Sequence, residues 1–345
     1  MVEQTARRQR EGGSGGYPVS LATNDASARA EALAEALVEG VLSGDRRALA
    51  RTVTLVENAT VSGREALAKL YGHTGKAHIV GITGGSGAGK STLANGLALE
   101  LRKRGRTIGI VAVDPSSPFT HGAILGDRIR MQELTKDPDI FIRSMATRGE
   151  LGGLAAMTSD VVAVLDAAGK DVIIVETVGA GQDEVEIASA AETTVVVLTP
   201  ASGDDIQAMK AGIMEVADIL VVNKADLPGA DSLIGLLVAA TTSASHGRLE
   251  TPVLATVATK REGIVELADA IEEHRKRLVR SGRQDQLRLD RARRHVLALL
   301  RQQLLDAALR GPAEDGSLDE TVRAVAERRL DPYTAAIRLS HSAGS

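Results

Sequence analysis

Short apolar runs alternate with helical segments through the middle of this chain. Between Lys76 and about Arg280, β-branched and aliphatic residues gather in short runs, and stretches with helical spacing separate them. The runs are His78–Thr83, Thr107–Val113, Asp139–Ser144, Asp171–Val175, Thr193–Leu198, Ala217–Val222 and Pro252–Thr256. This alternation predicts an α/β fold with a mostly parallel sheet that is flanked by helices on both faces.

Both flanks of this region have helical spacing instead. Residues 26–72 are rich in Ala and Leu, and they are interrupted at Ser43-Gly44-Asp45 and at Ser62-Gly63. Asp and Ser cap helix N-termini, so we expect helices to restart with Asp45 and Ser62 as their caps. After Arg280 the pattern is helical, first in a long basic segment and then in shorter pieces near 319–330 and 332–339.

The first apolar run leads into a glycine-rich loop that matches G-x-x-x-x-G-K-[ST]. The loop consists of Gly84, Gly85, Ser86, Gly87, Ala88, Gly89, Lys90 and Ser91, and a helical stretch from Thr92 follows. Backbone N–H groups and the helix N-terminus of such a loop stabilise phosphate charge. The lysine of this motif reaches the β- and γ-phosphates, and its Ser hydroxyl ligates Mg²⁺. The sequence therefore predicts a P-loop NTPase.

A second motif, after the run Ala217–Val222, indicates which base is bound. It reads Asn223-Lys224-Ala225-Asp226. A carboxylate accepts two hydrogen bonds from guanine N1–H and the exocyclic amine, a donor pair that adenine lacks. The aliphatic stem of Lys224 can cover one face of the base. We therefore expect GTP or GDP as the nucleotide, and residues 256–260 give a weaker signal for a further loop beside the base.

Acidic residues directly follow two of the apolar runs between these motifs. Asp114 and Glu176 each stand at the end of such a run. Ligands of open α/β sheets bind at the carboxyl ends of the strands, so both acids can face a metal ion. The N–H of Gly179 can sense the γ-phosphate nearby. A turn carboxylate is the alternative for each acid, and for Asp127 a solvated helix face competes with a place around the metal.

Composition narrows the class of protein. The 345 residues are enough for a full α/β core and an extra helical module. A formal net charge of -4 gives no overall basic field that would recruit nucleic acid or an anionic membrane. No apolar run approaches the ~20 residues of a membrane span, and Met1–Ser20 lacks the apolar core of a secretory signal. We therefore expect a cytoplasmic protein that begins with a disordered tail.

Cysteine and histidine usage argues against a dedicated metal cluster. The chain has 0 Cys, which excludes disulfides and thiolate metal sites. Its 7 His residues are scattered without the spacing that metal ligands usually show.

Four longer motifs accompany the two nucleotide motifs. They are Asp-Pro-Ser-Ser at 114–117, Leu-Gly-Asp-Arg-Ile-Arg-Met at 125–131, Glu-Thr-Val-Gly at 176–179 and Gly-Asp-Asp-Ile-Gln-Ala-Met-Lys at 203–210. With this set the chain resembles the MeaB/ArgK-like GTPases over residues 33–340. These are methylmalonyl-CoA mutase-associated G-protein chaperones, relatives of the human methylmalonic aciduria type A protein.

The resemblance implies a dimeric, Mg²⁺-dependent GTPase with slow hydrolysis that gates loading of adenosylcobalamin into an acyl-CoA mutase and helps remove damaged cofactor. The metal would be surrounded by Ser91, Asp114, Asp127 and Glu176. The catalytic set would be Lys90, Asp114, Glu176 and Gly179. Guanine would be read by Asn223, Lys224 and Asp226.

A further switch toward the mutase would lie in the motif at 203–210. Asp204, Gln207 and Lys210 occupy the matching positions. Without the resemblance, their three-residue spacing places them on one helical face, and a solvated polar face is the simpler account.

The basic segment at 274–301 has two possible uses. No aromatic residue interleaves its arginines, as stacking on unpaired RNA bases would require. Leu289, Val296, Leu300 and Leu304 recur at helical spacing beside the charges. This indicates an amphipathic helix that packs on a partner subunit or on its own domain. The resemblance favours a homodimer, and we expect neither nucleic acid nor a membrane as a partner.

We therefore expect four parts: a disordered tail at 1–22, an N-terminal helical region at 23–75, a P-loop GTPase domain at 76–282 and a C-terminal helical dimerisation region at 283–345. Two other functions stay open. A metallochaperone GTPase that delivers nickel would share the nucleotide core, although the chain lacks cysteine. A kinase of a lysine/arginine/ornithine transport system would need an acceptor site with a catalytic base, and no such base is evident in the sequence.

Overall fold

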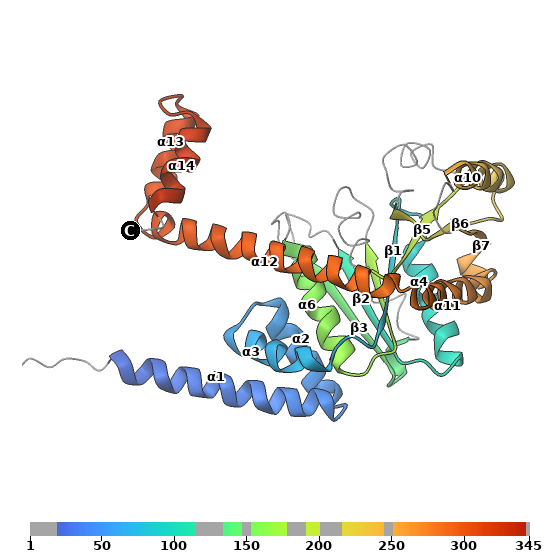
Figure 1. The fold of residues 1–345 in the computed structure, drawn as a ribbon, viewed down its shortest axis with the longest axis horizontal. Helices are drawn as coiled ribbons and strands as arrows, with labels where there is room; N and C mark the ends of the chain where they lie inside the picture. The colour runs from blue at the N-terminus through green and yellow to red at the C-terminus, as the bar shows by residue number, and fades with distance from the viewer. Residues whose placement is uncertain are drawn as a thin grey trace, which may run out of the picture.

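A parallel β-sheet forms the centre of the molecule (Figure 1). The computed structural model describes residues 19–114, 134–146, 153–177, 191–200, 216–244 and 251–342. Within these ranges a 7-stranded sheet has the order β3-β2-β4-β1-β5-β6-β7, and every neighbouring pair is parallel. The strands are β1 (His78–Gly84), β2 (Ile108–Asp114), β3 (Ile140–Ala146), β4 (Val172–Thr177), β5 (Thr193–Leu198), β6 (Ile219–Asn223) and β7 (Val253–Thr256).

The predicted fold class is confirmed. Each apolar run singled out in the sequence is a strand, and the ends differ by no more than two residues. Strands β4, β5 and β6 are buried along their whole length, which explains why they read as continuous apolar runs rather than as alternating patterns. Because the strands are parallel, their carboxyl ends meet at one edge of the sheet.

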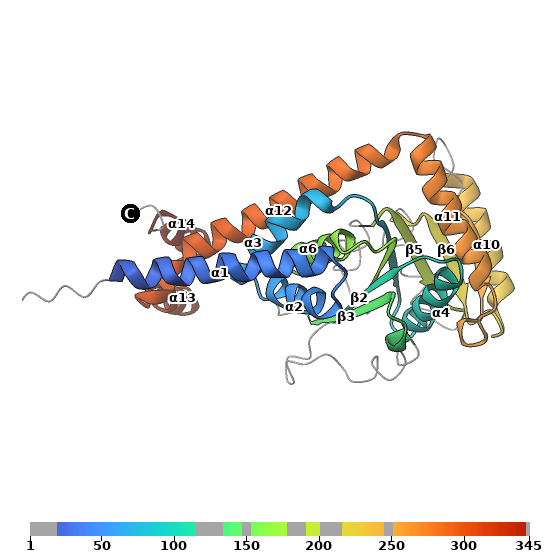
Figure 2. The same ribbon diagram turned by 90° about the horizontal axis from the view of Figure 1, so that it is seen from below.

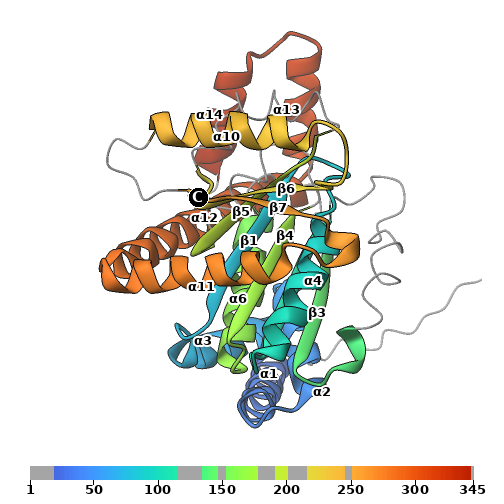
Figure 3. The ribbon, with the colours of Figure 1, turned by 90° about the vertical axis from the view of Figure 1, so that its right-hand side faces the viewer.

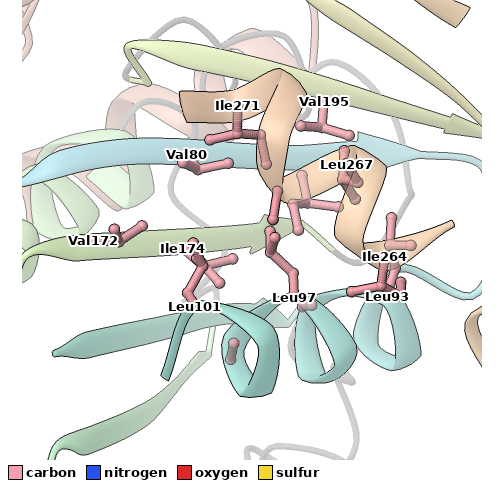
Figure 4. Close-up of a cluster of buried hydrophobic side chains, with 14 of the residues drawn as sticks. Val80, Leu93, Leu97, Leu101, Val172, Ile174, Val195, Ile264, Leu267 and Ile271 are labelled. Atoms are coloured by element: carbon pink, nitrogen blue, oxygen red, sulfur yellow. The ribbon is translucent and has the colours of Figure 1, made fainter. Parts of the chain in front are cut away.

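Two helices, α4 (Lys90–Lys103) and α11 (Ile264–Arg280), cover one face of the sheet (Figures 3 and 4). Their apolar residues recur every three or four positions, so each helix presents one stripe to the strands. The side chains in contact are Leu93, Leu97, Leu101, Ile264, Leu267 and Ile271 from the helices, and Val80, Val172, Ile174 and Val195 from the strands. None is more than 4% exposed. Burial contributes about 1.5–3 kcal/mol per large side chain, which fixes α4 behind the glycine loop.

The opposite face is covered by α6 (Gly153–Ala167) and α10 (Ala230–Ala244). Helix α6 packs on the β2 and β4 side, whereas α10 packs on β5 and β6. Helices α2 (Arg46–Glu57) and α3 (Val61–Leu70) pack on α6, and α1 (Val19–Leu42) packs on both of them. The short 3-10 turns are η1 (Tyr71–His73), η2 (Leu134–Lys136) and η3 (Ala258–Lys260).

One of the two predicted helix caps is right and the other is wrong. Asp45 caps α2, and its side chain accepts from the N–H of Arg47 at 2.8 Å. Helix α3 instead begins after Thr60, whose hydroxyl accepts from the N–H of Gly63 at 3.1 Å. Gly63 is therefore inside the helix, where a Cβ would stand 2.4 Å from the carbonyl oxygen of Leu55. The glycine allows close packing of α3 on α2, and it does not mark a helix break.

The C-terminal helices run back across the molecule (Figure 2). Helix α11 ends at Arg280, and Gly282, with φ 69°, reverses the chain into α12 (Arg283–Glu314). Helix α12 packs on α6, and α13 (Ser317–Ala326) and α14 (Pro332–Ser342) pack at its far end. The basic segment predicted from the sequence is thus divided between two helices.

Candidate functional site

The phosphate-loop motif joins β1 to α4, as the sequence predicts. Gly84 has φ 140°, and a Cβ there would stand 2.1 Å from the carbonyl oxygen of Val197, so only glycine fits against β5. Gly89 is the N-cap of α4 with φ 90°, a conformation that glycine adopts without strain. Among the described residues, no side chain caps this helix, so its first N–H groups could donate to an anion bound at the sheet edge.

Lys90 folds back over this loop. Its Nζ donates to the carbonyl oxygens of Gly84, at 2.6 Å, and Gly85, at 2.9 Å. The residue is only 5% exposed, so its ammonium is fixed beside the loop rather than free in solvent. This arrangement places a positive charge next to the cradle of backbone N–H groups.

A serine and a carboxylate meet beside the lysine. The Ser91 hydroxyl donates to Oε1 of Glu176, although the two residues are 85 positions apart. Glu176 is 3% exposed and lies at the carboxyl end of β4. Next to it, the Thr177 hydroxyl donates to Thr83 Oγ1 at 3.2 Å, which joins the ends of β4 and β1. Sequence reasoning placed Ser91 and Glu176 near one another but missed this threonine pair.

A hydroxyl and a carboxylate in contact form an oxygen donor set that suits Mg²⁺, which binds through one or two carboxylates, waters and phosphate oxygens. In the part of the chain that the structure describes, no group of three or more Asp, Glu, His or Cys side chains could hold a metal ion. A bound Mg²⁺ would therefore also need ligands from water or from the phosphates. Asp114 is the last residue of β2 and stands at the same sheet edge. Asp127 and Gly179 lie outside the described residues.

The guanine motif follows β6 and contacts the phosphate loop. Asn223 Nδ2 donates to the carbonyl oxygen of Ala88 at 2.8 Å. Its Oδ1 accepts from Thr256 Oγ1 and from the N–H of Ala258, each at 3.1 Å. The 256–260 segment, which gave only a weak signal in the sequence, therefore fixes the orientation of the Asn223 side chain.

Asp226 and Lys224 project from this motif toward solvent. Lys224 has φ 57°, a left-handed conformation that is uncommon for a residue with a side chain and occurs often at functional sites. Lys260 Nζ donates to Asp226 Oδ2 at 3.1 Å. This hydrogen bond lowers the pKa of Asp226 and raises the pKa of Lys260 from their usual values. Nothing in the sequence pattern indicated this ion pair.

Comparison with known proteins identifies the family. The family model described as methylmalonyl Co-A mutase-associated GTPase MeaB matches residues 49–313. The chain belongs to the MeaB family. It contains both nucleotide motifs described above, and this MeaB-family protein is a GTPase that binds guanine nucleotides.

Relatives of this MeaB-family chain come from distant organisms. It is 51% identical to a protein of Pyrococcus abyssi named as a GTPase, over 85% of this chain and 91% of the relative. It is 34% identical to the GTPase ArgK of Escherichia coli, over 86% and 92% of the two chains. The crystal structure of a LAO/AO transport system kinase superposes with a TM-score of 0.67 at 26% identity, covering 91% of this chain and 98% of that one.

The remaining predictions for the MeaB-family site are not tested by the described residues. Asp204, Gln207 and Lys210 lie outside them, so their predicted role toward a partner stays a prediction. In the described ranges, no helix has both the length and the apolar character to cross a bilayer.

Proposed function

We propose that this protein is a Mg²⁺-dependent GTPase that acts as a G-protein chaperone for a cobalamin-dependent acyl-CoA mutase, with methylmalonyl-CoA mutase as the first choice. The family description names that mutase as the associated enzyme. A 39% identical protein of Caenorhabditis briggsae, aligned over 54% of this chain and 49% of the relative, is named a methylmalonic aciduria type A homolog. The chaperone would gate entry of adenosylcobalamin into the mutase and help remove damaged cofactor.

The observation that supports the proposed Mg²⁺-dependent hydrolysis is the meeting of four groups at one sheet edge. Lys90 supplies positive charge to the phosphates, and the N-terminus of α4 supplies N–H donors. Ser91 and Glu176 would hold Mg²⁺ between them, with Asp114 and Asp127 proposed around it. The ion would neutralise charge that develops on the transferred phosphate. The phosphate-binding residues are proposed as 84–92.

Guanine recognition would use Asn223, Lys224 and Asp226. Asn223 ties the motif to the phosphate loop, so the base and the phosphates of one nucleotide would be held by a single rigid unit. Asp226 would accept from N1–H and the exocyclic amine, and the Lys224 stem would cover the ring. The N–H of Gly179 would report whether a γ-phosphate is bound.

The division into parts is also a proposal. Residues 1–22 would be a disordered tail, 23–75 a helical region, 76–282 the GTPase domain and 283–345 a dimerisation region. The exposed apolar residues of α12 support a homodimer, since a large apolar stripe is unusual on the surface of a monomer. A cytoplasmic location and the absence of a nucleic acid partner are part of the same proposal.

A partner-gating GTPase must bind its client differently in the GTP and GDP states, so client and nucleotide are coupled in both directions. The test is GTP turnover with and without the purified mutase. We expect the mutase to accelerate wild-type hydrolysis. Gln207→Ala and Lys210→Ala should leave basal turnover within a few-fold of wild type and reduce this acceleration at least about tenfold, which is 1.4 kcal/mol.

The outcomes separate the alternatives. If no acyl-CoA mutase stimulates the wild type, the chaperone proposal is wrong. If both variants keep full stimulation, the switch assignment alone is wrong. GTP labelled at the γ-phosphate tests the name carried by the similar kinase structure: release as free phosphate supports a GTPase cycle, and label on a protein would support a kinase.

A further inference from the structure

Lys260 brings an ammonium group to the carboxylate that would read guanine. Its Nζ donates to Asp226 Oδ2 over 3.1 Å. Guanine offers two donors along one edge, and a carboxylate meets such a pair with one oxygen for each donor. The ammonium is therefore hydrogen-bonded to one of the two carboxylate oxygens that the base would need.

The backbone sets the position of Lys260. It ends the turn η3, and its N–H donates to the carbonyl of Val257 at 2.9 Å. Val257 also forms an antiparallel bridge with Glu262. Gly263, with φ 77°, closes the loop where a Cβ would stand 2.2 Å from the carbonyl oxygen of Ala255. The turn is thus held by hydrogen bonds to Val257, the residue that follows β7, and by the close approach of Gly263 to Ala255.

The backbone around Asp226 is held just as firmly. The N–H of Ala225 donates to the carbonyl of Thr256 at 3.0 Å, and the N–H of Leu227 donates to the carbonyl of Lys224 at 3.0 Å. Two neighbouring turns therefore direct opposite charges at each other. Both side chains are nevertheless accessible, Lys260 at 55% and Asp226 at 42%, so the pair can open when a ligand arrives.

We propose that Lys260 is a specificity-determining residue of the guanine site, which competes with the guanine amine for Asp226 and thereby weakens guanine binding. The proposal rests on the function above, because it requires Asp226 to read the base. An exposed ion pair is weak, so the competition tunes affinity and does not block the site. Faster release of GDP would let the GTPase cycle proceed with less need of an exchange factor.

The test compares two diphosphates that differ only at this edge. Inosine diphosphate lacks the exocyclic amine and presents N1–H alone. Lys260→Met keeps the aliphatic stem and removes the charge. Loss of a positive charge near the site acts on the phosphates of both ligands alike, so the ratio of their affinities isolates the base. We expect calorimetry to show that this variant prefers GDP over inosine diphosphate about two- to fivefold more strongly than the wild type.

Two controls accompany this variant. Lys260→Arg keeps the charge and should retain the wild-type ratio. Lys276→Met removes a lysine of similar exposure, 59%, that pairs with Glu273 on α11, and it should also leave the ratio unchanged. Raising the salt concentration should shrink the difference between wild type and Lys260→Met, because salt screens an exposed pair.

The results distinguish this inference from the function on which it rests. If Lys260→Met leaves the ratio of GDP to inosine diphosphate affinity unchanged or lowers it, Lys260 does not compete for Asp226 and the inference is overturned. If the wild type binds ADP as tightly as GDP, guanine reading itself is wrong, and the inference falls with it.

Discussion

Asn223 donates its side-chain amide to the carbonyl oxygen of Ala88 over 2.8 Å, which joins the guanine motif to the phosphate loop. The same side chain accepts two hydrogen bonds from the 256–258 segment and is 2% exposed. Gly89 stands so close that a Cβ would lie 2.5 Å from Asn223 Nδ2. The two motifs therefore form one packed unit, and damage to this contact should affect both.

Replacing Asn223 by Ala should destabilise the fold as well as weaken nucleotide binding. Three buried hydrogen-bonding groups would lose their partner, and we expect the free energy of unfolding to fall by about 2–3 kcal/mol. Urea denaturation measures this loss. Asn58→Ala is the matched control, because Asn58 is exposed at the end of α2 and should change stability by only about 0.5 kcal/mol. Equal losses in the two variants would show that the hydrogen bonds of Asn223 stabilise the fold no more than those of an exposed asparagine.

Replacing Asp226 by Asn should change the preferred base. The amide presents a donor where the carboxylate accepts, so it suits xanthine, whose O2 accepts where guanine donates. We expect GTP affinity to fall about 30-fold or more while affinity for xanthosine triphosphate rises. Titration of both nucleotides against wild type and variant gives the answer. A variant that still prefers GTP would remove Asp226 from the guanine site.

The sequence alone was sufficient to predict those parts of the site whose residues lie close together in the chain. The glycines and Lys90-Ser91 lie in one short motif, and a strand and a helix must flank it for the motif to work. The strands could be predicted for a similar reason, since a run such as Thr193–Leu198 is buried on both faces and contains only β-branched residues and Leu.

Contacts between distant segments could not be predicted. Asn223 and Ala88 are 135 positions apart, and Lys260 and Asp226 are 34 apart, so their meeting depends on how β6 and β7 end. The error at Ser62 has a local cause: Thr60 caps the helix equally well, and the glycine after Ser62 serves packing on Leu55 rather than a turn. Propensity alone does not distinguish a glycine that packs from one that breaks a helix.

The contact between Ser91 and Glu176 predicts different effects for the two residues. Ser91→Ala removes a proposed metal ligand, so it should lower the affinity for Mg²⁺ and abolish hydrolysis. Glu176→Ala should reduce turnover at least about tenfold and reduce nucleotide affinity less. Magnesium titrations of turnover and of nucleotide binding separate these effects. Ser281→Ala, in the exposed turn after α11, is the control. Wild-type turnover in Glu176→Ala would exclude Glu176 from the catalytic set.

A buried histidine should make stability depend on pH. His78 Nε2 and His274 Nδ1 each lie 2.8 Å from Thr193 Oγ1, at the amino ends of β1 and β5. Burial, together with the neighbouring side chains of Arg275, His274 and Arg291, lowers the pKa of His78 from 6.5 to about 3. The folded protein keeps His78 neutral, whereas the unfolded chain binds a proton below pH 6.5.

The contribution of His78 to the free energy of unfolding should therefore be fully present above its unfolded pKa of 6.5. It should be lost progressively as the pH drops from 6.5 toward 3. One proton contributes a slope of about 1.4 kcal/mol per pH unit in this window. His78→Gln does not titrate and can still donate an amide to Thr193. Urea unfolding at several pH values measures how the free energy of unfolding depends on pH. In the variant this dependence should be less steep by the contribution of one proton. Identical slopes would mean that His78 is protonated in the fold.

Helix α12 supports the last prediction, that two chains associate through its apolar stripe. Leu289, Val296, Leu300 and Leu304 recur along one side and are 65%, 62%, 46% and 62% exposed in the single chain. The sequence pattern allowed packing on the same domain or on a partner, and this exposure favours a partner. Each buried leucine contributes about 1.5–3 kcal/mol, so Leu300→Asp with Leu304→Asp should weaken dimerisation at least about 100-fold.

Light scattering after size-exclusion chromatography measures this change over a range of protein concentrations. Leu236→Asp on α10 replaces a leucine of similar exposure, 50%, and should leave the oligomeric state unchanged. Retained GDP affinity would show that the α12 variant is folded, because α12 does not contribute to the nucleotide site. A dimer that survives the double substitution would place the interface on another surface, whereas a wild-type monomer at high concentration would refute the homodimer itself.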